Sequence, residues 1–111
     1  MKYRDTKRDT LDAYAAHLEQ PQALGLKDGR TMASTVEHIE RKMINGRTWV
    51  DATHMDSEVL NYRTRYLATV TAQIGILISF SSHKSYFKAY QPLLEESVRS
   101  IKVYQRYDET P

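Results

Sequence analysis

The chain contains no cysteine among its 111 residues, which excludes disulfide bonds, thiol catalysis and thiolate metal ligands. The missing cysteine leaves the cellular compartment open. Glycine and proline are also scarce, at four and three residues, and they form neither a Gly-rich phosphate loop nor a nucleophile elbow. The commonest sequence motifs of nucleotide-binding proteins and serine hydrolases are therefore absent.

A long hydrophobic run is missing as well. The longest apolar segment, 67–80, is interrupted by Thr69, Thr71 and Gln73. A helix that spans a bilayer needs about 20 predominantly apolar residues, so this segment predicts a buried core element instead. No basic, apolar, small-residue signal stands at the N-terminus. We expect a cytoplasmic protein with no membrane partner.

No single sign of charge dominates the composition. Sixteen Lys and Arg against 14 Asp and Glu give a net charge of +2, which by itself implies no acidic partner. The distribution is less even than the total. The segment between Glu58 and Glu95 contains no acidic residue but holds four basic ones: Arg63, Arg65, Lys84 and Lys88.

The stretch 56–80 carries the main prediction about the fold. From Tyr66 to His83 no side chain is formally charged. At helical spacing one face collects large apolar side chains: Val59, Tyr66, Val70, Ile74 and Leu77. The opposite face collects small ones, which would let another backbone approach closely: Ala68, Ala72, Gly75 and Ser79. This pattern predicts a long central helix covered on both sides.

The same stretch also has a period-two pattern. From Thr69 to Phe80 apolar residues, many of them β-branched, alternate with polar or small ones. A strand needs partners, because two strands alone are only marginally stable, and Arg47–Thr53 is the only other convincing candidate. We therefore prefer the helix. We predict a single domain (1–111) that is an all-α bundle of four or five helices, with mobile tails at 1–9 and 108–111. The alternative is an α+β fold with a small sheet from 47–53 and 69–80.

Four further helices complete the predicted bundle. They cover Thr10–Gln20, Thr31–Asn45 and Lys84–Tyr90, and a last one begins at Pro92. The pattern in 31–45 is the most regular, with apolar positions at i, i+4, i+7 and i+11: Met32, Val36, Ile39 and Met43. Asn45-Gly46 predicts the end of that helix, because both residues tolerate the left-handed conformation. The last helix is expected to bury Leu94, Val98 and Ile101.

One group of polar residues could carry metal or acid–base chemistry. Asp51, His54 and Asp56 lie close together in sequence. Their spacing fits no defined motif, and Asp56 has an ordinary role as a helix cap. We therefore predict no catalytic residue, no metal and no cofactor, with a hydrolase centred on His54 as the enzymatic alternative.

Tyrosine is unusually frequent, with eight residues, most of them beside basic ones. Two clusters supply the candidate binding residues: Tyr62, Arg63, Arg65, Tyr66, Lys84, Tyr86, Lys88 and Tyr90. Tyr and Arg are enriched at protein–protein hot spots, whereas aromatic rings among Lys and Arg can also stack bases and neutralise phosphates. The plain structural alternative is that the rings pack at the edge of the core with their hydroxyls in water. Arg63 falls inside the apolar face, where a buried guanidinium needs an acidic or carbonyl partner, for which the candidates are Glu37, Glu40 and Glu96. The alternative is that this end of the helix is exposed and Arg63 points at a binding partner.

These patterns predict a non-enzymatic, small helical binding protein that acts through a protein partner or through self-assembly, as a homodimer. The reason is that a two-sided apolar helix offers more apolar surface than so small a bundle covers, and exposed apolar area marks interfaces. The alternative is a protein that binds nucleic acid without reading sequence, through the Tyr, Arg and Lys clusters. An accessory or regulatory role in a mobile element is suggested only by association with the composition.

Overall fold

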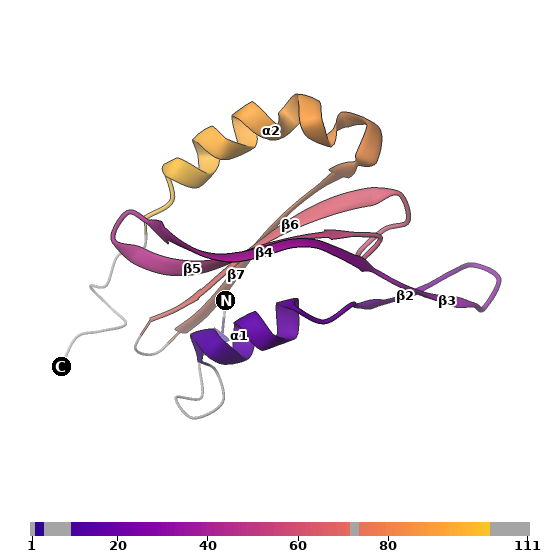
Figure 1. Ribbon diagram of the computed structural model, residues 1–111, viewed down its shortest axis with the longest axis horizontal. Coiled ribbons are helices and arrows are strands. Elements are labelled where there is room, and N and C mark those ends of the chain that lie inside the picture. Colours follow the sequence, from indigo (N-terminus) through magenta and orange to yellow (C-terminus); the bar gives the residue numbers. More distant parts are fainter. Residues whose placement is uncertain (1, 4–9, 72–73, 103–111) are drawn as a thin grey trace.

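The computed structural model describes residues 2–3, 10–71 and 74–102, and it shows a sheet between two helices (Figure 1). A five-stranded antiparallel sheet forms the middle layer, and a two-stranded hairpin extends from its side. The predicted all-α bundle is therefore wrong, and the α+β alternative is closer. The predicted tails at 1–9 and 108–111 lie outside the described residues, apart from a short strand at 2–3.

The elements follow a simple order along the chain. They are β1 (Lys2–Tyr3), α1 (Leu11–Leu18), β2 (Ala23–Gly25), β3 (Thr31–Ala33), β4 (Thr35–Ile44), β5 (Arg47–Met55), β6 (Tyr62–Val70), β7 (Ile74–His83) and α2 (Lys84–Arg99). Strands β4 to β7 pair with their neighbours in sequence, and the order across the sheet is β1-β7-β6-β5-β4. Strand β1 covers only the start of β7, through the pairs Lys2↔Gly75 and Tyr3↔Ile74.

The segment 31–45, predicted as the most regular helix, forms β3 and β4. Asn45 and Gly46 have φ angles of 48° and 82°, and Ile44 pairs with Arg47 across them. Two left-handed residues between paired strands make the tight turn whose twist suits a β-hairpin. The left-handed tendency of Asn45-Gly46 was predicted correctly, but it reverses a strand rather than ending a helix.

The predicted central helix is also wrong, because 56–80 folds as a loop and two strands. Asp56 and Asn61 both have left-handed φ angles, 65° and 67°, and the Asn61 N–H donates to Asp56 Oδ1 at 2.6 Å. The chain turns again after β6, where the Thr71 N–H donates to the Ile74 carbonyl at 2.8 Å. Ala72, one member of the predicted small-residue face, lies outside the described residues.

Helix α1 packs on one face of the sheet, and it confirms the helix predicted over Thr10–Gln20. Thr10 caps it, with Oγ1 accepting from the Ala13 N–H at 3.1 Å. The core beneath it consists of Leu18, Val50, Ala52, Tyr66 and Ala68. The side chain of Tyr14 in α1 lies directly over Gly75 of β7, where a β-carbon would collide with Tyr14 Oη. The predicted approach of a second backbone along a small-residue helix face is therefore wrong, because Gly75 lies on a strand and its neighbour is a side chain.

Helix α2 packs on the other face and runs without a break from Lys84 to Arg99, with Pro92 inside it. The predicted separate helices at 84–90 and from Pro92 are one element. The core under α2 consists of Ile44, Trp49, Leu67 and Val98, with Leu94 and Ile101 packed against it, which confirms the predicted buried side of this segment. Neither helix in the described parts of the chain is long and apolar enough to cross a bilayer.

Candidate functional site

Helix α2 has a different surface on each of its two flanks. Successive helical residues are about 100° apart, so Phe87, Leu94 and Val98 face the sheet while the flanks diverge. On the β4 side the helix borders a polar groove of about 500 Å³, to which α2 contributes Phe87, Lys88, Gln91 and Glu95. On the β7 side it borders an apolar groove of about 330 Å³, lined by Phe80, Ser81, Ser82, Phe87, Tyr90, Leu93, Leu94 and Ser97.

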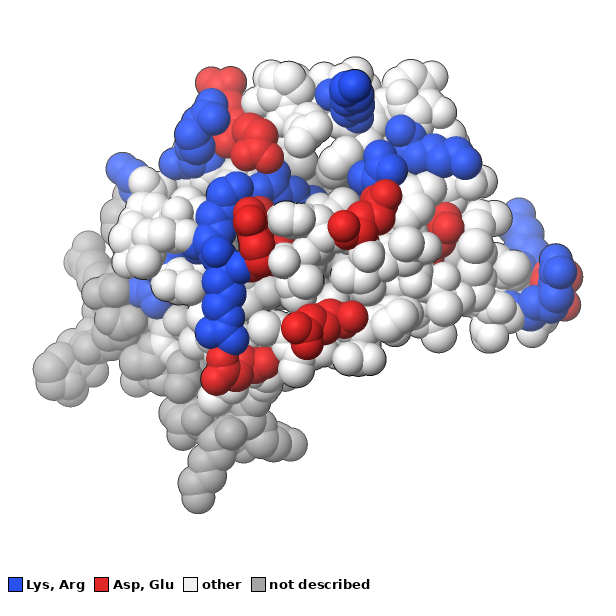
Figure 2. Space-filling model, viewed as in Figure 1, with Lys and Arg blue, Asp and Glu red and all other residues white. Residues whose placement is uncertain are grey.

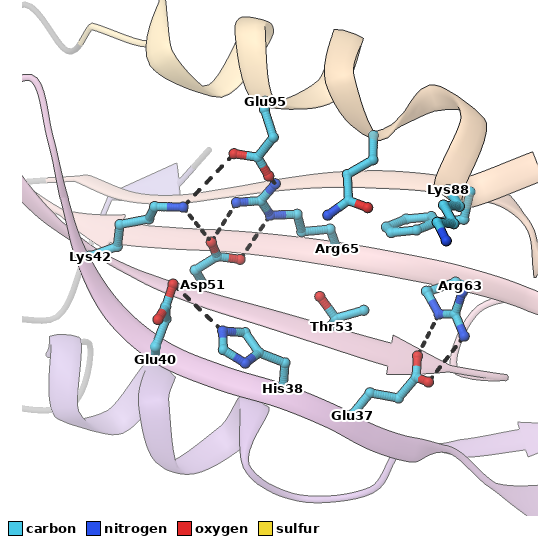
Figure 3. Close-up of a pocket in the computed structure, with 12 residues that line it drawn as sticks. Glu37, His38, Glu40, Lys42, Asp51, Thr53, Arg63, Arg65, Lys88 and Glu95 are labelled. Carbon is cyan, nitrogen blue, oxygen red and sulfur yellow. Dashed lines mark hydrogen bonds and ion pairs between the residues drawn. The ribbon is translucent and has the colours of Figure 1, made fainter.

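A buried ion-pair network forms one end of the polar groove (Figure 3). Arg65 donates from Nε and Nη2 to the two carboxylate oxygens of Asp51, at 2.9 and 2.6 Å, and from Nη1 to Glu95. Lys42 Nζ lies 3.5 Å from the Asp51 carboxylate. The hydrogen bonds to Asp51 raise the pKa of Arg65, against the opposing effect of burial. The network therefore holds β4, β5, β6 and α2 together.

A second ion pair forms the other end of the same groove. Arg63 donates to both carboxylate oxygens of Glu37, at 2.5 and 3.1 Å. Its guanidinium also lies 5.5 Å from the centre of the Phe87 ring. The hydrogen bond from Glu37 raises the pKa of Arg63. Glu37 is one of the three partners that the sequence offered for this arginine, so that prediction is confirmed.

The charges of the polar groove compensate one another. Four acidic and four basic side chains line it: Glu37, Glu40, Asp51, Glu95, Lys42, Arg63, Arg65 and Lys88. On the face seen in Figure 2, Lys and Arg side chains are interleaved with Asp and Glu and do not gather in one basic patch. His38 Nε2 lies 3.5 Å from Glu40 on the rim. The groove consequently has no net charge that would favour an anion over a cation.

The apolar groove has an exposed aromatic and aliphatic rim. Tyr86, Tyr90 and Leu93 share one flank of α2, and their exposed fractions are 59%, 55% and 64%. Phe80 packs at the edge of the core beneath them. Single exposed apolar residues are ordinary, but three in a row on one helix flank beside a groove form a contiguous apolar surface.

The two edges of the sheet differ in charge. Strand β4 is one edge, and it carries five charged or titratable residues as well as an irregularity between Val36 and His38: Glu37, His38, Glu40, Arg41 and Lys42. Strand β7 is the other edge beyond Gly75, since no described residue pairs there on the side away from β6. Its sequence from Ile74 to Ser82 contains no charged residue. Charges and bulges are the usual protection of an edge strand, so β4 is protected and β7 is not.

The structure separates six of the eight predicted Tyr and basic residues into three environments. Arg63 and Arg65 are committed to ion pairs in the polar groove, where Lys88 also lies. Tyr86 and Tyr90 lie on the opposite flank of α2. Lys84 is exposed in the first turn of the helix. Aromatic and basic residues that alternate in the sequence of α2 therefore lie on two different flanks of the helix.

The other two predicted tyrosines have structural contacts. Tyr62 packs edge-on against His83, with ring centroids 5.6 Å apart. Tyr66 is buried, its hydroxyl lies 2.7 Å from Ser57 Oγ, and it donates to Glu58 at 2.7 Å. Burial raises the pKa of Tyr66 to about 12. Both rings therefore have structural roles, but the hydroxyl of Tyr66 is bonded inside the protein and not placed in water as the structural alternative expected.

The three residues considered for metal or acid–base chemistry are not brought together. Asp51 points into the polar groove, whereas His54 is fully buried under α1, with Nε2 2.7 Å from the Leu18 carbonyl. Asp56 lies in the loop that follows β5. Among the described residues no three His, Asp or Glu side chains form a group that could hold a metal ion.

Sequence reasoning missed two components of these surfaces. Asp51 was considered as a metal ligand and not as the partner of Arg65, because the pairing depends on the β5–β6 register. Phe80 and Leu93 were not among the candidate binding residues. The uncharged run from Tyr66 to His83 contained the signal for the β7 edge, but a segment interpreted as a helix has no sheet edge to consider.

No family model, curated protein or solved structure was found to match this chain.

Proposed function

We propose that this protein is a non-enzymatic binding protein that holds an extended segment of a protein partner along β7, beside α2. The observation that carries the proposal is an uncharged edge strand next to an exposed apolar flank of a helix. Along the free part of β7, alternate residues direct their N–H and C=O groups away from β6, where an added strand can bond to them. No described residue takes that position beyond Gly75.

The apolar groove gives such an added strand a basis for selectivity. Side chains of a strand alternate between the two faces of the sheet, so every second residue of the added segment would lie on the α2 side, next to Phe80. There it would meet Tyr90 and Leu93 of the helix. Backbone hydrogen bonds then supply affinity that does not depend on sequence, and the groove prefers apolar side chains at alternate positions.

The polar groove supports the non-enzymatic part of the proposal. A general acid, base or nucleophile must be able to exchange a proton or attack a substrate. Here the Asp51 and Glu95 carboxylates accept from Arg65, and the Glu37 carboxylate accepts from Arg63. Glu95 thereby holds α2 to β6, whereas Asp51 and Glu37 join β5 and β4 to β6. We also propose that the protein is cytoplasmic, as the sequence analysis expected. Fractionation of the cells that produce the protein naturally tests this location.

A peptide selection tests the proposed binding surface. Random linear peptides displayed on phage are selected on dilute immobilised protein, and the bound peptides are mapped by backbone hydrogen exchange. We expect peptides with apolar residues at alternate positions, and protection of amides in 77–83. Ser81→Lys places a charge on the free edge and should abolish binding.

Met43→Lys is the matched control. Met43 is 66% exposed on β4, so this variant adds the same charge to the other edge and should bind the peptides normally. Selected peptides that protect β4 or the polar groove, and that still bind Ser81→Lys, would contradict the proposed surface.

A further inference from the structure

We infer that the partner at β7 is a second copy of this chain, paired antiparallel about a two-fold axis that passes through Phe80. This inference rests on the proposed function, because it names the occupant of the same surface. Two sheets then join into one continuous sheet, with both α2 helices on the same face. Such an interface is closed, so it produces a dimer and not a filament.

The length of the free edge limits what can pair with it. Strand β1 occupies the position beside Gly75, and the strand ends at His83, where α2 begins. No residue in the described ranges pairs with this side of the strand from Ile76 to His83, so an added strand fits there, over a stretch longer than the commonest strand length of about 5–6 residues. The same stretch of a second copy has this length by identity, so it fits the available edge.

The alternation of side chains then places the axis. Antiparallel pairing of identical strands requires a two-fold axis perpendicular to the sheet, which keeps each face on its own side. Residues that point toward α2, such as Ile78 and Phe80, must face residues that also point toward α2. The axis therefore passes through a residue and not between two. An axis at Ser79 would bring His83 of the second copy beside Gly75, where Lys2 already lies. An axis at Phe80 avoids this overlap.

The groups that meet across this axis are compatible. Phe80 faces Phe80 of the second copy, and aromatic cross-strand pairs stabilise a sheet. Because Phe80 lines the apolar groove, the grooves of the two copies meet at the axis, and the flanks with Tyr90 and Leu93 approach each other. Charges that face their own copies repel across a two-fold axis. The free part of β7 carries no Asp, Glu, Lys or Arg, so this repulsion does not arise.

The absence of cysteine from the chain makes a disulfide test specific. With the axis at Phe80, Ser79 faces Ser81 of the second copy, at a Cα–Cα distance of about 4.5–5.5 Å. Both serines are exposed. Tagged Ser79→Cys chains mixed with untagged Ser81→Cys chains should therefore form a mixed disulfide under mild oxidation. Ser79→Cys alone should not, because its two copies lie about 8 Å apart and a disulfide requires no more than about 6.8 Å.

Light scattering completes the experiment. We expect a dimer mass for the unchanged chain and for Met43→Lys, and a monomer mass for Ser81→Lys. A dimer that survives Ser81→Lys, or a disulfide of Ser79→Cys with itself, overturns the inference. A monomer at concentrations well above micromolar also overturns it. If that monomer still binds selected peptides at 77–83, the proposed function stands; if it binds none there, both fail.

Discussion

Two arginines on the same strand and the same face allow a direct test of what burial does to an ion pair. Arg65 and Arg63 are two residues apart on β6, and each binds a carboxylate through two nitrogens. The side chains of Arg65 and Asp51 are 7% and 3% exposed, whereas those of Arg63 and Glu37 are 29% and 34% exposed. Replacing each arginine by Met removes the charge and keeps most of the aliphatic volume.

The two substitutions should differ in cost by more than the error of the measurement. Arg65→Met leaves the buried Asp51 carboxylate with Lys42 at 3.5 Å as its remaining cation. Breaking a buried pair costs about 3–5 kcal/mol, and Lys42 places this case near the lower end. Arg63→Met removes a partly solvated pair worth about 0.2–1 kcal/mol and a cation–π contact worth about 0.5–1 kcal/mol. We expect losses of about 3 kcal/mol and of less than about 2 kcal/mol.

Urea unfolding at one fixed protein concentration measures both losses, and a double variant identifies the cause. Arg65→Met with Asp51→Leu removes the stranded charge and leaves Lys42 beside Glu95 at 4.0 Å. This double variant should recover most of the stability that Arg65→Met loses, because two apolar residues replace a buried pair at little cost. Equal losses for the two single variants, or a double variant less stable than Arg65→Met, would refute the reasoning.

Two further predictions concern pH and nucleic acid. Burial raises the pKa of Tyr66 from 10.0 to about 12, so the unfolded chain releases this proton first. The stability that this group contributes is complete below pH 10 and should be lost as the pH rises through 12, a fall of about 3 kcal/mol. In Tyr66→Phe the free energy of unfolding, measured across the same pH range, should lose this pH dependence. A fall of the same size in the variant would show that another group causes it. If the protein binds nucleic acid, replacing Lys84 and Lys88 with Ala should reduce the slope of log affinity against log salt by about 1.4–1.8. An unchanged slope in a gel-shift titration would exclude these lysines from phosphate contact.

The sequence predicted the helical segments at the two ends of the chain but not the sheet between them. Helix α1 and the apolar side of α2 have local signals, namely the Thr10 cap and the spacing of Leu94 and Val98. Strand β4 has no such signal, because it is an edge strand whose faces are largely exposed. Met43 is 66% exposed there, so its helical spacing from Ile39 reflects no shared buried face. Hydrophobic periodicity reports a fold only where one face is buried.

Strand β6 could not be predicted from the sequence for the opposite reason. Its residues from Thr64 to Thr69 are buried on both faces, so no polar alternation marks it as a strand. The turn that follows begins at Thr71 and ends at Ile74 without Gly or Pro, so β6 and β7 appear continuous in the sequence. Among the candidate residues, the partner of Arg63 could be found from the need to neutralise a charge. The division of α2 into two flanks could not, because it depends on where the sheet lies.

The uncharged β7 strand also has a consequence for the chain once it unfolds. Ile74–Phe80, IGILISF, combines β-branched and aromatic residues with no charge and no proline, a composition typical of segments that form cross-β aggregates. In the folded protein β6 protects one side of this segment, and heating removes that protection. Thermal unfolding is therefore expected to be irreversible, with an apparent midpoint that depends on the scan rate. Because β7 carries no charge, the rate of unfolding and not the equilibrium stability is expected to set how long the protein survives at high temperature.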